Sequence, residues 1–239
     1  MMTSRTVTSP QARAILVPHK HGGTEYFLKG TNPKLLIVSG MHGDEYEVID
    51  CINEYVKQHI DQLPDFLFIP RVSPSAVAQK TRKNKFGRDV NRHFFDQSED
   101  PEAEDAMQIM RNYQVDLTIE FHEDPDRALG FYLYDSHALN EKDLVLYREK
   151  IQQTGARLYT GVDDPFDAHL GLHIEKGYIY TPLEILPKDA GFFVVWALTH
   201  GIAQRVLNPE IPGKAPLSLK RSLVTAVFSF FLPPDGVMS

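Results

Sequence analysis

Short apolar runs alternate with amphipathic stretches along most of the chain. Residues 35–38 and 66–69 are apolar throughout, which predicts strands that are buried on both faces. Residues 45–60 carry apolar side chains at helical spacing, which predicts a helix with one buried face. On the same grounds we expect strands over 14–17, 25–28, 34–39, 66–69, 115–121, 130–134, 157–159 and 178–186, and helices over 45–60, from 101, from 141 to Gly155 and over 192–207. Strands that alternate with helices predict an α/β fold, a three-layer α/β/α sandwich around a mixed, mostly parallel sheet.

The two ends of the chain are expected to lie outside this alternation. The turn His21-Gly22-Gly23 joins the first two strand candidates, so residues 1–33 are interpreted as an N-terminal hairpin. Residues 209–217 are rich in proline and predict a surface segment, and 223–232 predict an edge strand or an interface. We therefore expect one domain over 1–239, with 209–239 as a C-terminal extension.

Composition narrows the class of partner. The formal net charge of −7 argues against nucleic acid, which needs a basic face. The longest apolar stretches fall short of the roughly 20 residues that span a bilayer, and residues 1–17 lack the apolar core of a signal peptide. We therefore expect a cytoplasmic protein with no membrane partner. The single cysteine, Cys51, excludes an intrachain disulfide and is interpreted as a packed residue; the oligomeric state is left open.

A histidine and a carboxylate follow the first buried strand. In Gly40-Met41-His42-Gly43-Asp44-Glu45 the side chains of His42 and Glu45 are three residues apart, so one helical turn brings both to one ion. His122 ends the strand 115–121, at the edge of the sheet where the first pair is expected. Two imidazoles and one carboxylate with a fourth position left open form a catalytic zinc set, so one Zn²⁺ is the expected cofactor.

A base and a basic loop complete the candidate site. Glu184 lies in the predicted strand 178–186, where a carboxylate is costly unless it is paired or takes part in catalysis. It could take a proton from an attacking water and pass it to the leaving nitrogen; the alternative is an edge-strand glutamate that points to solvent. The long loop 72–96 carries several arginines, which predict either a solvated charged loop or a site for an anionic small molecule.

These motifs, in this order, resemble those of the zinc carboxypeptidase (funnelin) family. The resemblance covers residues 34–187, and its residues are Gly40–Glu45, Arg82, Asp89-x-Asn91-Arg92-x-Phe94, His122 and Glu184. The compact length and the stretch from Val72 to Phe94 are most similar to short bacterial murein peptide amidases. The related succinylglutamate desuccinylase and aspartoacylase branch also carries His-Gly-x-Glu and an Asn-Arg pair, usually with an extra C-terminal β domain, which we do not expect here.

The resemblance implies a role for each matched residue. His42, Glu45 and His122 would be the zinc ligands and Glu184 the general base. Arg82 would stabilise the oxyanion of the tetrahedral intermediate. The remaining implied roles concern the basic loop: Asn91 and Arg92 would bind the free carboxylate of the substrate, and Asp89 would orient a ligand histidine.

The chain departs from the family pattern at three places. Arg88 stands where the family usually has a small or apolar residue, and adds positive charge to the expected carboxylate site. The mobile-loop tyrosine of the family has no clear match. Nearby tyrosines are Tyr159, Tyr178 and Tyr180. His169 and His173 have the spacing of a second metal pair but are interpreted as loop residues.

Three functions remain open at this point. The first is a metallocarboxypeptidase or murein-peptide-amidase type of zinc hydrolase, which cleaves an amide bond next to a free carboxylate in a small anionic peptide. The second is a deacylase of N-acyl amino acids that uses the same residues. The third is an inactive relative that binds peptides, for which the unmatched tyrosine is the only support.

Overall fold

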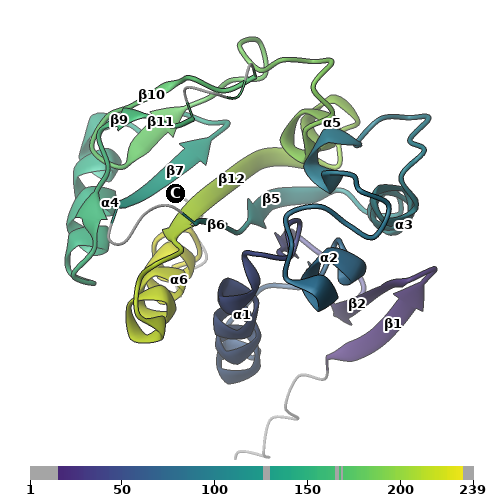
Figure 1. The fold of residues 1–239 in the computed structure, drawn as a ribbon. Coiled ribbons are helices and arrows are strands. Elements are labelled where there is room, and N and C mark those ends of the chain that lie inside the picture. The colour runs from purple at the N-terminus through teal and green to yellow at the C-terminus, as the bar shows by residue number, and fades with distance from the viewer. Residues whose placement is uncertain (1–15, 126–129, 165–166, 168, 234–239) are drawn as a thin grey trace, which may run out of the picture.

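A sheet of ten strands forms the centre of the computed structural model, counted over the residues that it describes: 16–125, 130–164, 167 and 169–233 (Figure 1). Along its main path the strands are β1 (Val17–His21), β2 (Thr24–Lys29), β4 (Phe66–Ile69), β3 (Leu35–Val38), β5 (Val115–Glu120), β12 (Ala203–Pro212), β7 (Gly130–Asp135) and β11 (Tyr178–Tyr180). Beside this path, β6 (His122–Asp124) pairs with β12 and β8 (Arg157–Leu158) pairs with β7. The short strands β9 (Gly161–Val162) and β10 (His173–Ile174) pair with each other.

The strands at the centre of this sheet run parallel. They are β4, β3, β5 and β12, and each pairs in parallel with the next. The outer strands β1 and β2 pair in antiparallel fashion, as do β12 and β7. This arrangement confirms the expected mixed, mostly parallel sheet. It also brings the carboxyl ends of β3, β5 and β12 to one edge, where the side chains that follow these strands can meet.

Helices cover both faces of the sheet. Alternate residues of β3 enter two different cores, because successive side chains of a strand point to opposite faces. Leu35 and Ile37 pack with α1 (Tyr46–His59), α4 (Glu141–Gln152) and α6 (Leu217–Phe231). Leu36 and Val38 pack with α3 (Pro101–Met110) and α5 (Phe193–Thr199). The three expected layers are therefore present. None of the described helices is both long and apolar enough to cross a bilayer.

Polar caps begin two of these helices at the predicted residues. The Asp100 carboxylate accepts hydrogen bonds from the N–H groups of Glu102 and Ala103, both at 3.0 Å. The Asn140 side chain accepts one from the N–H of Asp143 at 2.9 Å. Between β4 and α3 lies the long basic loop, which contains α2 (Pro74–Gln79) and a single 3₁₀ turn, η1 (Val90–Arg92). The N-terminal hairpin is present from Val17; Ala14 and Ile15 lie outside the described residues.

The last quarter of the chain differs from the prediction. Strand β11 ends at Tyr180, and the rest of the expected strand 178–186 forms turns. The expected helix 192–207 stops at Thr199, and its second half belongs to β12. Residues 223–232 are helical in α6 rather than an edge strand. Residues 209–239 were expected to form an extension, yet Pro209–Pro212 complete the central strand and α6 lies in the core.

Physical reasons for these errors can be seen in the packing. Pro209 lacks an N–H, which argues against a central strand. However, β12 pairs Leu207 with Ile119 of β5 and Glu210 with His122 of β6, so Pro209 lies at the interruption between these two ladders. Helix α6 is rich in β-branched and aromatic residues, but its burial against α1 outweighs that local preference. There Phe228 stacks on Tyr55 with ring centroids 4.4 Å apart.

Candidate metal centre and active site

Two glycines shape the loop that follows β3. Gly40 has a φ of +63°, in the left-handed region that favours glycine. A Cβ atom on Gly43 would lie 1.8 Å from the carbonyl oxygen of Ala76 in α2, so only glycine allows this close approach. The loop therefore packs tightly, and it delivers His42 and Glu45 to the edge of the sheet. Glu45 is the N-cap residue of α1 but makes no capping hydrogen bond, which leaves its carboxylate for the site.

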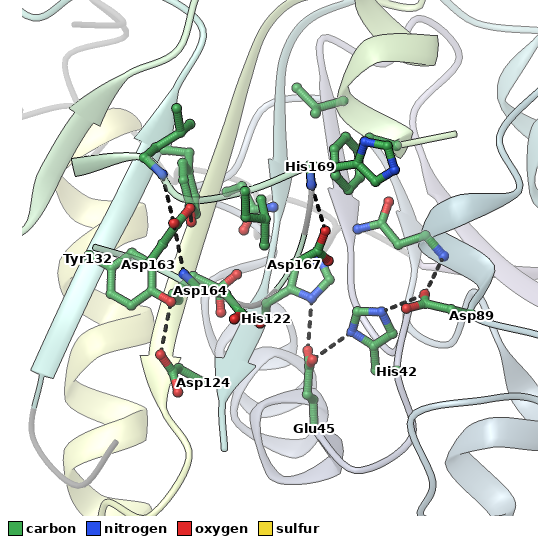
Figure 2. A pocket seen from close by; sticks show the side chains of 18 of the residues that line it. His42, Glu45, Asp89, His122, Asp124, Tyr132, Asp163, Asp164, Asp167 and His169 are labelled. Atoms are coloured by element: carbon green, nitrogen blue, oxygen red, sulfur yellow. Dashed lines mark hydrogen bonds and ion pairs between the residues drawn. The ribbon is translucent and has the colours of Figure 1, made fainter. Parts of the chain in front are cut away.

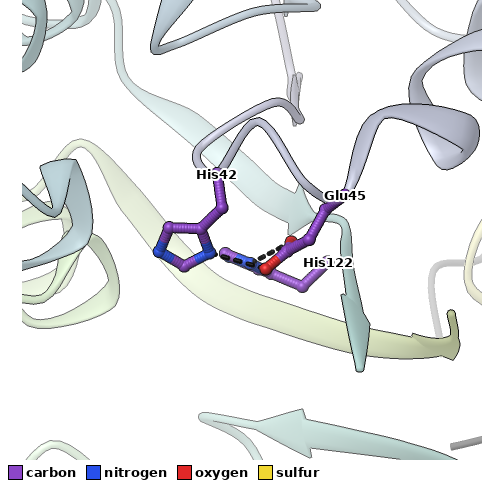
Figure 3. A group of neighbouring side chains, drawn as sticks. All are labelled: His42, Glu45 and His122. Carbon is purple, nitrogen blue, oxygen red and sulfur yellow. Dashed lines mark hydrogen bonds and ion pairs between the residues drawn. The ribbon is translucent and has the colours of Figure 1, made fainter. Parts of the chain in front are cut away.

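The structure brings His42, Glu45 and His122 together (Figure 3). Nδ1 of His42 lies 2.6 Å from Oε1 of Glu45, and Nδ1 of His122 lies 2.9 Å from Oε2 of the same carboxylate. One ligand atom from each of the three residues lies within 4.8 Å of the others. All three side chains are buried. Because two imidazole nitrogens and a carboxylate converge on one point, these residues fit a divalent metal ion.

The far nitrogen of each histidine faces a second carboxylate. Nε2 of His42 lies 3.0 Å from Oδ1 of Asp89, and Nε2 of His122 lies 2.9 Å from Oε1 of Glu120. Such carboxylates fix the tautomer and orientation of metal-binding histidines. The sequence indicated Asp89 but not Glu120. The signal that could have identified Glu120 is its position, two residues before His122 at the end of the same predicted strand.

The electrostatics of the three residues favour a cation. Burial lowers the pKa of both histidines, but the charges and hydrogen bonds of the surrounding carboxylates together outweigh this effect, so that the pKa of each is raised. These carboxylates are Glu45 and Asp89 for His42, and Glu45 and Glu120 for His122. Burial raises the pKa of Glu45, but the charges and hydrogen bonds of His42 and His122 together outweigh this effect and hold the pKa well below its usual range. The field that stabilises protons on the imidazoles also attracts a metal ion, which competes with those protons.

A cavity of about 670 Å³ opens beside the three residues (Figure 2). Arg82, Asn91 and Arg92 from the basic loop line it. Arg82 Nε donates to Oδ2 of Asp89 at 3.0 Å, so Asp89 joins an arginine to His42. Arg92 Nη2 lies 2.5 Å from Oδ2 of Asp167, and its guanidinium lies 4.3 Å from the ring centroid of Phe192. The Asn91 side chain accepts from the N–H of Phe193, which ties the loop to α5.

Arg88 does not join this group, which corrects its predicted role in substrate binding. Its guanidinium donates to the backbone carbonyl of Glu99, and Nη2 lies 3.5 Å from the Glu99 carboxylate. It is absent from the residues that line the cavity. The contacts with Glu99 hold the side chain along the outside of the loop, so the added charge does not reach the site.

Glu184 is also displaced from the expected position, and this corrects the prediction of a base on a strand. It lies exposed on a turn after β11, outside the cavity lining. Glu210 of β12 lines the cavity instead. In the sheet it lies between His122 of β6 and Tyr132 of β7, and residues paired across neighbouring strands point to the same face. Burial raises the pKa of Glu210 to about 8; Glu45 adds to the rise and His122 opposes it.

The sequence contained a signal for Glu210 that was outweighed. Val206-Leu207 is an apolar pair, and Glu210 follows it three residues later. The flanking Pro209 and Pro212 hid this signal because prolines argue against a central strand. A carboxylate close to the end of a parallel strand is therefore informative even where prolines interrupt the pattern.

The candidate tyrosines do not line the cavity. The hydroxyl of Tyr159 donates to the carbonyl of Val162 at 2.6 Å, Tyr178 donates to Asp135 at 2.9 Å, and Tyr180 is exposed. Two other tyrosines line the cavity. They are Tyr132, which donates to Asp124, and Tyr134, which donates to Asp163.

The two histidines of the loop after β9 do not form a second metal group. His169 lines the cavity and packs edge-on against Phe192, with ring centroids 6.3 Å apart. His173 lies exposed on β10. In the part of the chain that the structure describes, the only cluster with metal-binding geometry is that of His42, Glu45 and His122.

With this geometry established, comparison with known proteins gives the family. A model of the succinylglutamate desuccinylase/aspartoacylase catalytic domain matches residues 31–157. The chain belongs to this family. The part matching the desuccinylase/aspartoacylase domain includes His42, Glu45, Asp89 and His122, whereas Glu210 lies beyond it. No curated protein matches the chain.

Solved structures share the fold of this desuccinylase/aspartoacylase family member. A candidate metallopeptidase of Shewanella amazonensis is 19% identical, with a TM-score of 0.70 over 92% of this chain and 88% of that chain. A metallo-carboxypeptidase of Burkholderia cenocepacia is 15% identical, with a TM-score of 0.61 over 92% and 65%. A succinylglutamate desuccinylase of Chromobacterium violaceum is 13% identical, with a TM-score of 0.58 over 95% and 72%. These similarities confirm the expected zinc carboxypeptidase-like fold.

Removing either carboxylate behind the histidines is expected to weaken metal binding. Asp89→Asn and Glu120→Gln each replace the charged carboxylate beside a histidine by a neutral amide. The imidazole is then oriented less firmly, so the affinity for the metal should fall by about 10- to 100-fold. Titration of the metal-free protein with Zn²⁺ in the presence of a competing chelator measures this change. An unchanged dissociation constant in both variants would contradict the role of these carboxylates.

Proposed function

We propose that the protein is a zinc-dependent hydrolase that cleaves an amide bond next to a free carboxylate. One observation carries this proposal: Glu210 shares a cavity with the convergent side chains of His42, Glu45 and His122. A carboxylate that shares a cavity with a metal-binding triad, and is not itself one of the ligands, is the arrangement that hydrolytic water activation requires.

Zinc is the metal that the donor set favours. Two imidazoles and one carboxylate leave a fourth position open for water or substrate, as in catalytic zinc sites. When bound, the ion would act as a Lewis acid that polarises the scissile carbonyl and makes water more acidic. The absence of a cysteine from the group is consistent with this choice, because softer metals prefer thiolates.

Glu210 is proposed as the general base and acid. Burial raises the pKa of its carboxyl toward the operating range, where one group can accept a proton from the attacking water and return it to the leaving nitrogen. Its position between β6 and β7 keeps the side chain on the cavity side of the sheet.

Two arginines provide positive charge at separate places in the cavity. Arg82 is held by Asp89, which also contacts His42, so its guanidinium lies near the metal ligands where an oxyanion would develop. Arg92 lies over Phe192 and is proposed to bind the free carboxylate of the substrate. Asp167 contacts the same guanidinium and would have to yield or share it when substrate binds.

The size of the cavity favours a small substrate. A volume of about 670 Å³ accommodates a short peptide but not a folded protein. The leading substrate class is therefore a small peptide with a free carboxylate, and peptides of cell-wall origin belong to this class.

A second substrate class is an N-acyl amino acid. The match to the desuccinylase/aspartoacylase catalytic domain favours it. The same residues would carry out the reaction, because an N-acyl amino acid also presents an amide bond beside a carboxylate. The two substrate classes differ only in the group on the other side of the scissile amide bond, which is a peptide in the first class and an acyl group in the second.

A substrate panel tests the proposal. Purified protein would be loaded with Zn²⁺ and incubated with di- and tripeptides and with acetyl- and succinyl-amino acids, and released amines would be quantified. Chelation should abolish release and added Zn²⁺ should restore it. Release from peptides alone supports the peptidase, and release from acyl-amino acids alone supports the deacylase. Tight peptide binding by calorimetry without any product would instead indicate an inactive relative.

Loss of the Arg92 guanidinium should act on substrate binding. Arg92→Met is expected to raise KM for a carboxylate-bearing substrate by about 10- to 100-fold, because a hydrogen bond to a charged group contributes about 1.5–3 kcal/mol. The same substrate with its carboxylate amidated should be affected much less. Arg88→Met is the matched control and should leave KM unchanged, since Arg88 contacts Glu99 outside the cavity. Equal effects of the two variants would contradict the assignment.

A further inference from the structure

A buried lysine of helix α6, Lys220, points toward the residues next to the metal centre. The side chain of Lys220 is only 1% exposed. Its Nζ lies 2.5 Å from the Glu123 carboxylate and 2.6 Å from that of Glu47 at the start of α1. A buried ammonium group is costly, and breaking its pair would leave a buried charge without compensation. The proposed mechanism has no use for this residue.

Glu123 connects this lysine to the metal centre. It follows His122 directly on β6 and is itself buried, with 4% exposure. Its backbone N–H donates to Oε2 of Glu45 at 3.1 Å, the same oxygen that His122 contacts. Its side chain Oε1 accepts from the N–H of Val48 at 2.5 Å, in the first turn of α1. Glu123 therefore contacts both the carboxylate of Glu45 and the helix that carries it.

Lys220 determines where the Glu123 carboxylate can lie. One oxygen of that carboxylate contacts the ammonium group of α6 and the other contacts the N–H of Val48. Without the ammonium group, the carboxylate would be drawn from its buried position toward solvent in the cavity that Glu123 lines. The hydrogen bond to Val48 and the placement of the Glu123 backbone beside Glu45 would then be released together.

We propose that the Lys220–Glu123 ion pair is a positioning device for the zinc ligands, through which helix α6 controls the affinity and geometry of the site. This inference rests on the proposed zinc site. Lys220 touches neither metal nor substrate, and it acts through Glu123 on Glu45 and His122. The proposal depends on two contacts of Glu123. Its backbone N–H donates to the candidate ligand Glu45, and its carboxylate accepts from Val48 in α1, the helix that Glu45 begins.

Matched controls lie in the same interface. Arg221, the next residue of α6, pairs with Glu54 of α1 at 2.6 Å, so Arg221→Met removes an α1–α6 ion pair that does not reach the ligands. Glu47→Gln removes the other partner of Lys220 but leaves its contact with Glu123. The test variants are Lys220→Met and the isosteric Glu123→Gln. The double variant Lys220→Met/Glu123→Gln leaves no unpaired buried charge and serves if Lys220→Met does not fold.

The experiment measures the affinity for Zn²⁺ by competition with a chelator, and the absorption spectrum of the Co²⁺-loaded protein. Thermal unfolding of each metal-free variant records purely structural effects. Lys220→Met, Glu123→Gln and their combination should lower Zn²⁺ affinity by about 10- to 100-fold and alter the Co²⁺ bands. The two controls should change the affinity by less than about twofold, even where they lower the unfolding temperature.

The outcomes separate this inference from the proposed function. If the test variants bind Zn²⁺ as tightly as Arg221→Met and show the wild-type Co²⁺ spectrum, the positioning role is overturned while the zinc site remains. If the wild-type protein binds no Zn²⁺, the proposed function is overturned, and the inference that rests on it is overturned as well.

Discussion

Glu210→Gln is expected to lower kcat by about 1000-fold while the protein still binds Zn²⁺. The amide keeps the size of the side chain but can no longer accept the proton of the attacking water. Since Glu210 is not one of the three converging ligands, the metal content should stay near one ion per chain. Steady-state rates on the best substrate of the panel, together with metal analysis of the purified variant, measure both quantities.

The control for this prediction is Glu184→Gln. Glu184 is exposed on a turn and does not line the cavity, so its substitution should leave kcat within about twofold. A variant pair in which Glu184→Gln is inactive and Glu210→Gln retains wild-type turnover would reverse the assignment of the base.

His122→Ala is expected to lower the affinity for Zn²⁺ by more than about 100-fold. This effect is larger than that expected for Asp89→Asn or Glu120→Gln, because a ligand itself is lost. The substitution removes one of three converging donors and also removes the imidazole that contacts Glu120. Activity at micromolar Zn²⁺ should fall below detection, with part of it returning at higher concentrations. Calorimetric or chelator-competition titration provides the dissociation constant.

His173→Ala serves as its control. This histidine is exposed on β10, outside the metal cluster, and its substitution should leave Zn²⁺ affinity and activity unchanged. Undiminished Zn²⁺ binding by His122→Ala would show that the ion is held elsewhere or by fewer residues.

The elements of the first three-quarters of the chain could be predicted because local and tertiary preferences agree there. The run 66–69 is buried on both faces, and it forms β4 as its apolar pattern indicates. Asp100 and Asn140 cap helices with the hydrogen bonds that their side chains favour. In such segments the local preference for a strand or a helix agrees with the burial that tertiary packing requires.

The last quarter could not be predicted because tertiary contacts override local signals. Pro209 is tolerated in β12 only where one neighbouring ladder ends and the next begins, and that interruption is a property of other strands. Phe228 favours a strand locally, yet it packs on Tyr55 and Phe121 from a helix. Neither fact can be read from the sequence of the segment itself.

The residues of the candidate site could likewise be predicted only in part. His42, Glu45 and His122 were identified because each follows an apolar strand, and strand ends meet at one edge of the sheet. The base was misplaced because its position depended on which late segment forms the central strand. Lys220 gave no signal, since a lysine in an amphipathic stretch is usually solvated and only the packing of α6 shows its burial.

The place of β12 in the sheet also has a consequence for biosynthesis. This strand is made after both of its neighbours, β5 and β7, and is inserted between them. Until residue 212 has left the ribosome, each neighbour presents an open edge that can pair with another chain. A nascent or truncated polypeptide therefore carries the ligand histidines without a completed sheet, and we expect it to depend on chaperones and to aggregate when they are limiting.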